Sequence, residues 1–163
     1  MTNILVCGHI DLTPEQFKQY YIPVISPLMD NVTFYVGGAS GTDKLAQVYL
    51  VNNGCKVVVC DKGTQNNVID MIKCDHINGF ESYIDRDKFM VNKCSTTIAL
   101  LKNNVMSLGS GSFRNLVHMH FGEKVAEDFM THARSKQWDS ADECLNAFNL
   151  NGIQTLSTTA LVI

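Results

Sequence analysis

The chain has 163 residues, of which 45% are hydrophobic and 18% are charged, and its formal net charge is −3. A chain of this length folds as one domain, which we expect to span residues 1–163, and buries roughly 70% of the surface that it exposes when unfolded. Its lysines and arginines are spread along the sequence, which disfavours the basic surface that neutralises a nucleic-acid backbone. We therefore expect a small-molecule partner and no nucleic acid.

The cysteine pattern and the N-terminus indicate the compartment. Six cysteines are present, and two of them, Cys7 and Cys60, close apolar runs that are typical of buried strands. Buried free thiols are therefore expected rather than disulfides. The first ten residues do not resemble a signal peptide, and no segment approaches the roughly 18 apolar residues of a membrane span. We expect a cytoplasmic protein, or an intracellular product of a virus, without a membrane partner.

The chain begins with a predicted strand and a predicted helix. Residues 3–7 form a short apolar run, as expected for a strand that helices cover on both faces. A capping box formed by Thr13 and Gln16 predicts the start of a helix. Pro23 and Pro27 must kink or end this helix, because each proline removes a backbone donor and clashes with the preceding turn.

A glycine-rich loop joins the second predicted strand to the next helix. Residues 33–36 are β-branched and aromatic, the loop GGASGT occupies 37–42, and a helical pattern covers 43–53. The apolar run at 56–60 then completes a βαβ unit with a short crossover. The sequence therefore predicts an α/β fold with a mainly parallel sheet.

The second half of the chain begins with a region of weak periodicity, which is followed by further predicted helices and strands. Residues 61–80 are polar, and we expect them to form a mobile lid or loop with one short helix near 68–74. The patterns that follow predict helices at 81–93, 113–121, 123–136 and 139–148, and strands at 96–101 and within 153–163.

The loop at 37–42 has the features of a phosphate site. Glycines let a ligand approach the backbone, and the amides and dipole of the following helix favour a negative charge. Asp43, in the first helical turn, either caps that helix or binds a ribose hydroxyl. A tight turn alone would explain the same glycines. The phosphate contacts predicted in this loop are Gly37, Gly38, Ser40, Gly41 and Thr42.

A second glycine loop, at 109–112, makes a ligand site more convincing. In a doubly wound sheet, loops at the carboxyl ends of neighbouring strands converge on one crevice. The sequence GSGS before a helix also suits phosphate contact better than nucleophilic attack by a serine. The contacts predicted in this loop are Gly109, Ser110, Gly111 and Ser112.

Three segments together resemble the SLOG superfamily of Rossmann-like proteins, which includes relatives of the cytokinin-activating LOG enzymes and of the DNA-processing protein DprA. These segments are GGASGTDKLA at 37–46, YIDRDKFM at 83–90 and GSGSFRN at 109–115. The resemblance covers about residues 3–121. It implies a single Rossmann-like three-layer domain that binds a nucleotide-type or sugar-phosphate ligand at the carboxyl edge of the sheet. Relatives of this fold often pair through helices, so the resemblance is also compatible with a homodimer.

The resemblance gives Arg86 a role and also shows a departure. Arg86 falls where relatives place a polar contact, so its planar guanidinium would hold a phosphate or carboxylate. The alternative is a surface ion pair with Asp85 or Asp87. The LOG enzymes use a PGGxGTxxE loop whose glutamate serves N-glycosidic bond cleavage, whereas the loop here lacks that proline and has no acid at the same spacing after Thr42.

Three residues are candidates for catalysis. Asp43 or Asp87 would supply a carboxylate in place of the missing glutamate. His9 follows the first strand and would reach the same crevice, where it would act as an acid, a base or a hydrogen-bond donor. No group of histidines and cysteines has the spacing of a zinc site, and we predict neither a metal nor a cofactor.

These features are consistent with an enzyme, a binding protein or a structural protein. The first hypothesis is a nucleotide-binding enzyme that cleaves or transfers at an N-glycosidic bond of a nucleotide or an ADP-ribose-like molecule. The second is a non-catalytic protein that senses or sequesters a nucleotide, which the missing glutamate favours. The third is a structural or interaction protein that retains an inherited loop.

Overall fold

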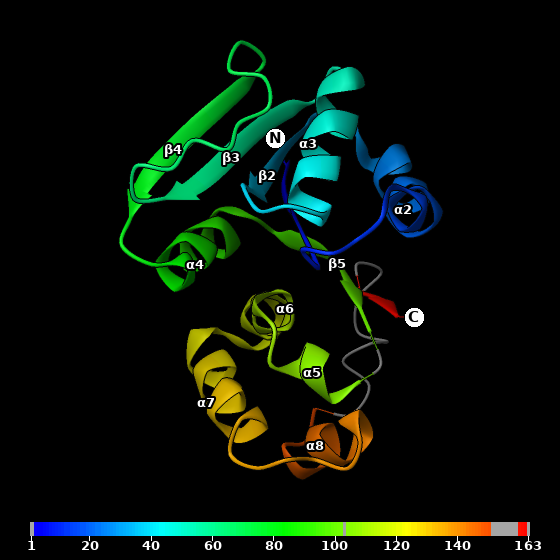
Figure 1. Cartoon of the computed structure of the whole chain (residues 1–163), viewed down its shortest axis with the longest axis vertical. Helices are drawn as coiled ribbons and strands as arrows, with labels where there is room; N and C mark the ends of the chain where they lie inside the picture. The colour runs from blue at the N-terminus through cyan, green and yellow to red at the C-terminus, as the bar shows by residue number, and fades with distance from the viewer. Residues whose placement is uncertain (1, 103, 151–159, 163) are drawn as a thin grey trace.

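The computed structural model describes residues 2–102, 104–150 and 160–162. Six strands in this part of the chain form one parallel sheet with the order β4-β3-β2-β1-β5-β6 (Figure 1). The strands are β1 (Thr2–Cys7), β2 (Val32–Gly37), β3 (Lys56–Lys62), β4 (Cys74–Phe80), β5 (Thr96–Leu101) and β6 (Ala160–Val162).

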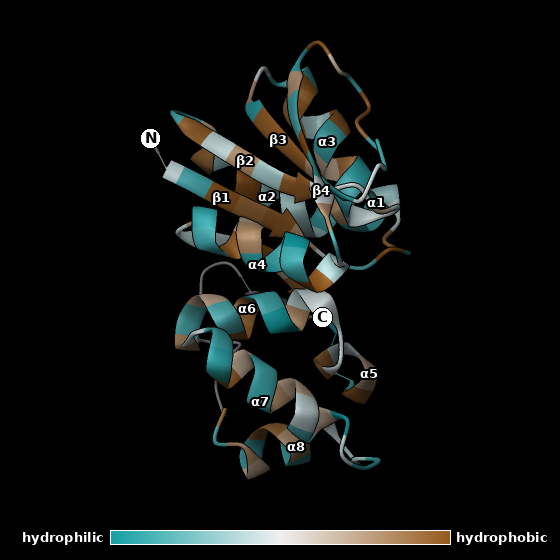
Figure 2. Ribbon diagram, turned by 90° about the vertical axis from the view of Figure 1, so that its left-hand side faces the viewer, coloured by the Kyte–Doolittle hydropathy of each residue, from teal (hydrophilic) through white to brown (hydrophobic). Residues whose placement is uncertain are grey.

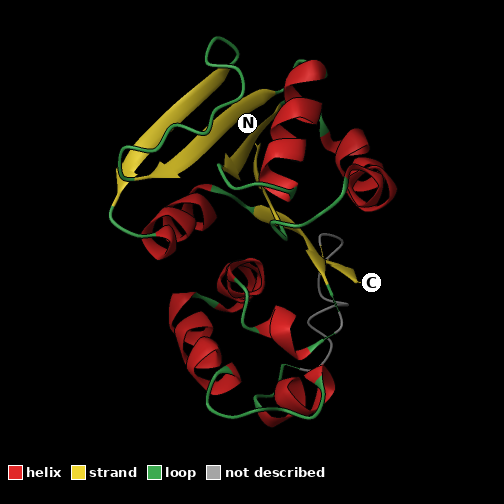
Figure 3. Ribbon diagram, in the orientation of Figure 1, coloured by secondary structure: helices red, strands yellow, loops and turns green. Residues whose placement is uncertain are grey.

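Helices cover both faces of the sheet, and a group of helices extends beyond β5 at one end of the molecule (Figure 3). None of the described helices is long and apolar enough to cross a membrane. The long helices are α3 (Thr42–Asn52), α4 (Tyr83–Lys93), α6 (Gly111–Phe121) and α7 (Glu123–Ala133). The shorter helical segments are α1 (Pro14–Gln16), η1 (Phe17–Tyr21), α2 (Ile22–Ile25), η2 (Ser26–Leu28), α5 (Val105–Leu108) and α8 (Ala141–Ala147).

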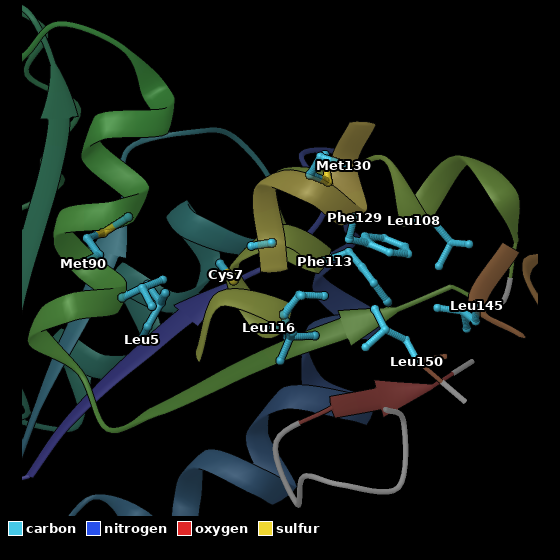
Figure 4. Close-up of a cluster of buried hydrophobic side chains, with 14 of the residues drawn as sticks. Leu5, Cys7, Met90, Leu108, Phe113, Leu116, Phe129, Met130, Leu145 and Leu150 are labelled. Carbon is cyan, nitrogen blue, oxygen red and sulfur yellow. The ribbon is translucent and has the colours of Figure 1, made fainter. Parts of the chain in front are cut away.

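The apolar strands divide the core into two layers, because successive side chains of a strand point to opposite faces. Ile4 and Val6 of β1 pack into the layer beneath α3 and the segment from α1 to η2. Leu5 and Cys7 pack into the other layer with α4 and α6. Figure 2 shows the hydrophobic strands β1 and β3 between these helices. Figure 4 shows that the second layer continues from Leu5 to the helices beyond β5. The fold is therefore a single three-layer α/β domain of Rossmann-like type, as predicted.

The first helical segment begins where the capping box predicts. The Thr13 hydroxyl accepts a hydrogen bond from the Gln16 amide at 3.2 Å, and the Gln16 side chain accepts one from the Thr13 amide at 3.1 Å. The helical path continues past Pro23, since the five-residue π turn η1 changes the hydrogen-bonding pattern just before the proline. A short 3₁₀ turn containing Pro27 ends it.

The strands predicted at 3–7, 33–36, 56–60 and 96–101 are confirmed, as are the long helices, with ends that differ by a few residues. The prediction for 61–80 is wrong in two respects. The strand β4 occupies Cys74–Phe80 instead of a loop, and the described residues at 68–74 form turns and the start of β4 instead of a short helix. This strand lies at the sheet edge and is only partly buried, so it lacks the apolar run that marks β3. The last strand is confirmed as β6, while 151–159 lie outside the described residues.

The strand order places a reversal of winding next to β1. Strands β2, β3 and β4 lie on one side of β1, and β5 and β6 lie on the other, so the direction of winding reverses between β1 and β5. In open α/β sheets, ligands bind outside the carboxyl ends of the strands at such a reversal. The loops that follow β1, β2 and β3 meet at this edge.

Candidate functional site

Two adjoining cavities lie at the carboxyl edge of the sheet, and Ile10, Ala39, Tyr83 and Arg86 line both. Cavity A, of about 490 Å³, lies over the ends of β2 and β3, and its further lining residues are Gly38, Asp61, Gln65 and Asn67. Cavity B, of about 330 Å³, lies between β1, α4 and the start of α6, and its further lining includes Gly8, His9, Gly37, Asp43, Asp87, Gly111 and Ser112. The two predicted glycine loops thus meet at one site.

The first glycine loop is bonded to the loop after β1. The Thr42 amide and hydroxyl both donate to the His9 carbonyl, at 3.1 and 3.0 Å, and the Ser40 hydroxyl donates to the Ile10 carbonyl at 3.3 Å. Gly41 has a φ of 72°, and a Cβ there would collide with the carbonyl oxygens of His9 and Ile10. The hydroxyls of Ser40 and Thr42 are therefore used within the protein, while Gly37 and Gly38 face the cavities.

Asp43 is buried beside Gly37, at the start of α3. Its Oδ2 accepts a hydrogen bond from the Ala39 amide at 3.1 Å. Burial raises the pKa of the Asp43 carboxyl to about 7, although the Ala39 bond and the charge of Arg86 act in the opposite direction. Asp43 therefore gains and loses a proton near neutral pH while lining cavity B.

Arg86 is held on two sides and separates the cavities. Its Nε and Nη2 atoms donate to Oδ1 of Asp87 at 3.1 and 2.8 Å, and its guanidinium lies 4.9 Å from the centre of the Tyr83 ring. Nη1 faces Gly37, where a Cβ would lie 3.2 Å from it. The predicted pair with Asp87 exists, but it lies at the wall of the cavities and not on an exposed helix face.

Asp87 holds two arginines rather than one. Its Oδ2 accepts a hydrogen bond from Nη2 of Arg114 at 3.1 Å, while Oδ1 accepts from Arg86. Both carboxylate oxygens are therefore engaged, and the side chain is buried. This geometry orients Arg86 toward the cavities.

The second glycine loop supplies the N-terminus of α6 to cavity B. The Ser110 hydroxyl accepts from the Phe113 amide at 3.2 Å and donates to the Ser107 carbonyl at 2.7 Å, so it acts as the N-cap. Gly111 and Ser112 follow as the first helical residues and line the cavity. The early amides of a helix and its dipole favour an anion. Gly109 instead ends α5.

His9 and Cys7 border cavity B in uncharged forms. Burial, with the nearby charge of Lys102, lowers the pKa of His9, so this imidazole is neutral at pH 7. Its Nε2 is buried and makes no hydrogen bond among the described residues. Burial raises the pKa of Cys7 to about 12, which keeps the thiol protonated and unreactive. All six cysteines are free thiols, as predicted.

A polar cluster at cavity A was missed by sequence reasoning. Asp61, which is 1% exposed, accepts hydrogen bonds from the Asn67 amide and side chain, both at 2.8 Å, and lies 2.9 Å from Nε2 of His76. Burial alone would raise the pKa of Asp61, but these bonds outweigh it and lower the pKa. The Gln47 side chain donates to the Asn67 and Gly37 carbonyls, both at 3.3 Å. The one available signal was an aspartate directly after a buried strand.

The sequence matches no protein-family model and no curated protein. DNA processing protein A (DprA) from Streptococcus pneumoniae has a similar structure, with a TM-score of 0.52 and 17% identity over 99% of this chain and 58% of that chain. The structural genomics target TM1055 gives a TM-score of 0.50 with 12% identity over 63% of this chain and 62% of that chain. The chain thus spans about six tenths of each protein that it matches. This likeness shows that the chain shares a Rossmann-like fold with these two proteins, as its three sequence segments implied.

Proposed function

We propose that this protein binds a nucleoside phosphate across the two cavities. The observation that carries the proposal is the placement of Arg86, which lines both cavities. Its Nε and Nη2 atoms bond to Asp87, while Nη1 forms no hydrogen bond among the described residues. A phosphate in cavity B meets this guanidinium and the amides of Gly111 and Ser112 at the start of α6. The nucleoside then extends into the larger cavity A.

Asp43 gives the site the means to cleave an N-glycosidic bond. Its carboxyl lines cavity B, and its pKa of about 7 suits a general acid or base at neutral pH. In the proposed hydrolysis, water bonds to C1′ of the ribose as the C1′–N bond breaks. The base leaves with a proton from Asp43, and the proton released by the water restores the carboxyl.

Chromatography of reaction mixtures tests this function. Unmodified protein incubated with AMP or ADP-ribose should release a free base from AMP, or a corresponding glycosidic cleavage product from ADP-ribose. The Asp43→Asn variant should lose at least about a hundredfold in rate, the usual contribution of a general acid. Asp128→Asn is the matched control, because the exposed Asp128 side chain on α7 forms an ion pair with Lys124 and with no other described residue. Equal turnover by the Asp43→Asn variant would refute the role of Asp43.

A non-catalytic nucleotide sensor is the second candidate. It is favoured by the engagement of Asp87, whose two oxygens both hold arginines, so only Asp43 remains for proton transfer among the predicted carboxylates. A sensor would bind the same phosphate and release the nucleotide unchanged. Mass spectrometry of the recovered ligand distinguishes the two functions.

A further inference from the structure

We infer that a phosphate group in cavity B and a proton on Asp43 bind together, so that the phosphate of the ligand keeps the Asp43 carboxyl in its acid form. The inference rests on the proposed binding of a nucleoside phosphate and adds a property of the same site. The phosphate group is then needed for proton donation as well as for binding.

Asp43 is a buried carboxyl without a charged partner. The residue is 7% exposed, and its side chain accepts one hydrogen bond among the described residues, from the Ala39 amide to Oδ2. The nearby guanidinium of Arg86 directs Nε and Nη2 to Asp87 and forms no ion pair with Asp43. A buried carboxylate that lacks an ion pair is costly, so the group takes up a proton instead.

A phosphate in cavity B increases this cost. The cavity has a volume of about 330 Å³, and Arg86 is the one lysine or arginine among the described residues that line it. An ionised Asp43 and a phosphate dianion would therefore share a small cavity with a cation that already bonds to Asp87. Like charges in one site favour the protonated form of the weaker acid. A protonated carboxyl can also donate a hydrogen bond to a phosphate oxygen, which a carboxylate cannot.

The other titratable groups around Asp43 keep their charge states above neutral pH. These groups, which face Asp43 or line the same cavity, are Cys7 of β1, His9 in the loop after β1, Tyr21 of η1, Asp61 of β3, and Arg86 and Asp87 of α4.

Burial raises the pKa values of Cys7 and Tyr21 and lowers that of His9, so these three side chains are uncharged. Burial would lower the pKa of Arg86, but the charge of Asp87 raises it, and Arg86 stays charged. The pKa of Asp43 is about 7, so the protein alone has lost most of this proton at pH 8, and a bound phosphate restores it.

Calorimetric titrations of ribose 5-phosphate and AMP into the unmodified protein test the inference. Both ligands are dianions above about pH 7.5, because the second pKa of a phosphate monoester is about 6, so a change in affinity there reports on the protein. The affinity should fall at least about threefold from about pH 7.5 to about pH 8.5. Titrations near pH 8 in two buffers of different ionisation enthalpy should show uptake of about half a proton or more per ligand.

Asp43→Asn is the diagnostic variant, because asparagine keeps the size of the side chain and an acceptor for the Ala39 amide. It should show neither proton uptake nor a fall in affinity, and it should bind both phosphates more tightly than the unmodified protein at about pH 8.5. Asp128→Asn, on the exposed side of α7, should behave like the unmodified protein.

The outcomes separate the inference from the proposed function. Phosphate binding by the unmodified protein with constant affinity and no proton uptake would overturn the inference alone. Equal proton uptake by Asp43→Asn would assign the proton to another group and would overturn it as well. Absence of binding by both phosphates would overturn the proposed function and the inference with it.

Discussion

The glycine loop after β2 and the glycine loop before α6 lie at the same edge of the sheet, yet they are held in different ways. In the first loop, Gly41 has a positive φ and sits against two backbone carbonyls, and Thr42 bonds to the His9 carbonyl. In the second loop, Ser110 caps α6, and Gly111 and Ser112 leave the helix start open to cavity B. A similar sequence pattern therefore forms a rigid scaffold in one place and a helix start that is open to cavity B in the other.

The first loop also shows two different reasons for a glycine. Glycine at 41 is required by the backbone itself, whereas Gly37 and Gly38 are required by neighbouring side chains, Asp43 and Asp61 respectively. Substitutions in the first loop should therefore mainly lower the free energy of unfolding. Substitutions at the start of α6 should also lower the affinity for a ligand. Three predictions, ordered from the largest expected effect to the smallest, test this contrast.

Gly41→Ala should cost about 4 kcal/mol or more in the free energy of unfolding, because the new Cβ is both strained and in collision with backbone. The matched control is Gly54→Ala. Gly54 has a φ of 71° but nothing within 4 Å of its Cβ position, so only the strain of about 1 kcal/mol remains. Denaturant unfolding measures both values, and equal losses would show that Gly41 does not brace the loop after β1.

Asp43 should make the protein less stable as pH rises from about 4 to 7. The folded pKa of about 7 lies above the ordinary value of 3.8, so the folded state holds a proton in this window that the unfolded state has lost. The expected loss is on the order of 3 kcal/mol. Asp43→Asn should remove this dependence, and its unfolding free energy should exceed that of the unmodified protein at pH 8. A pH profile that is unchanged in the variant would contradict the burial of Asp43.

Ser110→Ala should cost about 1 kcal/mol of stability, the usual value of a helix N-cap. Ser140→Ala removes the equivalent cap of α8, away from both cavities, and should cost the same. Only Ser110→Ala should also weaken AMP binding, because the start of α6 lines cavity B. Thermal unfolding and calorimetry measure the two quantities. Unaltered AMP affinity in this variant would remove the second loop from the site.

Sequence reasoning could point to the candidate site but not to all of the residues that line it. The apolar runs and the Thr13 capping box predict local structure, because they depend on neighbouring residues in the chain. The position of Arg86 was accessible through family resemblance. The cluster of Asp61, Asn67 and His76 was not, because its bonds join β3, a polar loop and an edge strand that has no apolar run. Contacts of this kind depend on tertiary structure.

The most direct test of the central claim is calorimetric titration of AMP into the unmodified protein and into the Arg86→Gln variant. The account predicts saturable binding that weakens by at least about a hundredfold in Arg86→Gln, since the variant loses the charged fork between the cavities. Lys124→Gln removes the same charge from the surface of α7 and should bind AMP normally. Binding of AMP by Arg86→Gln with undiminished affinity would contradict a phosphate site at this edge of the sheet.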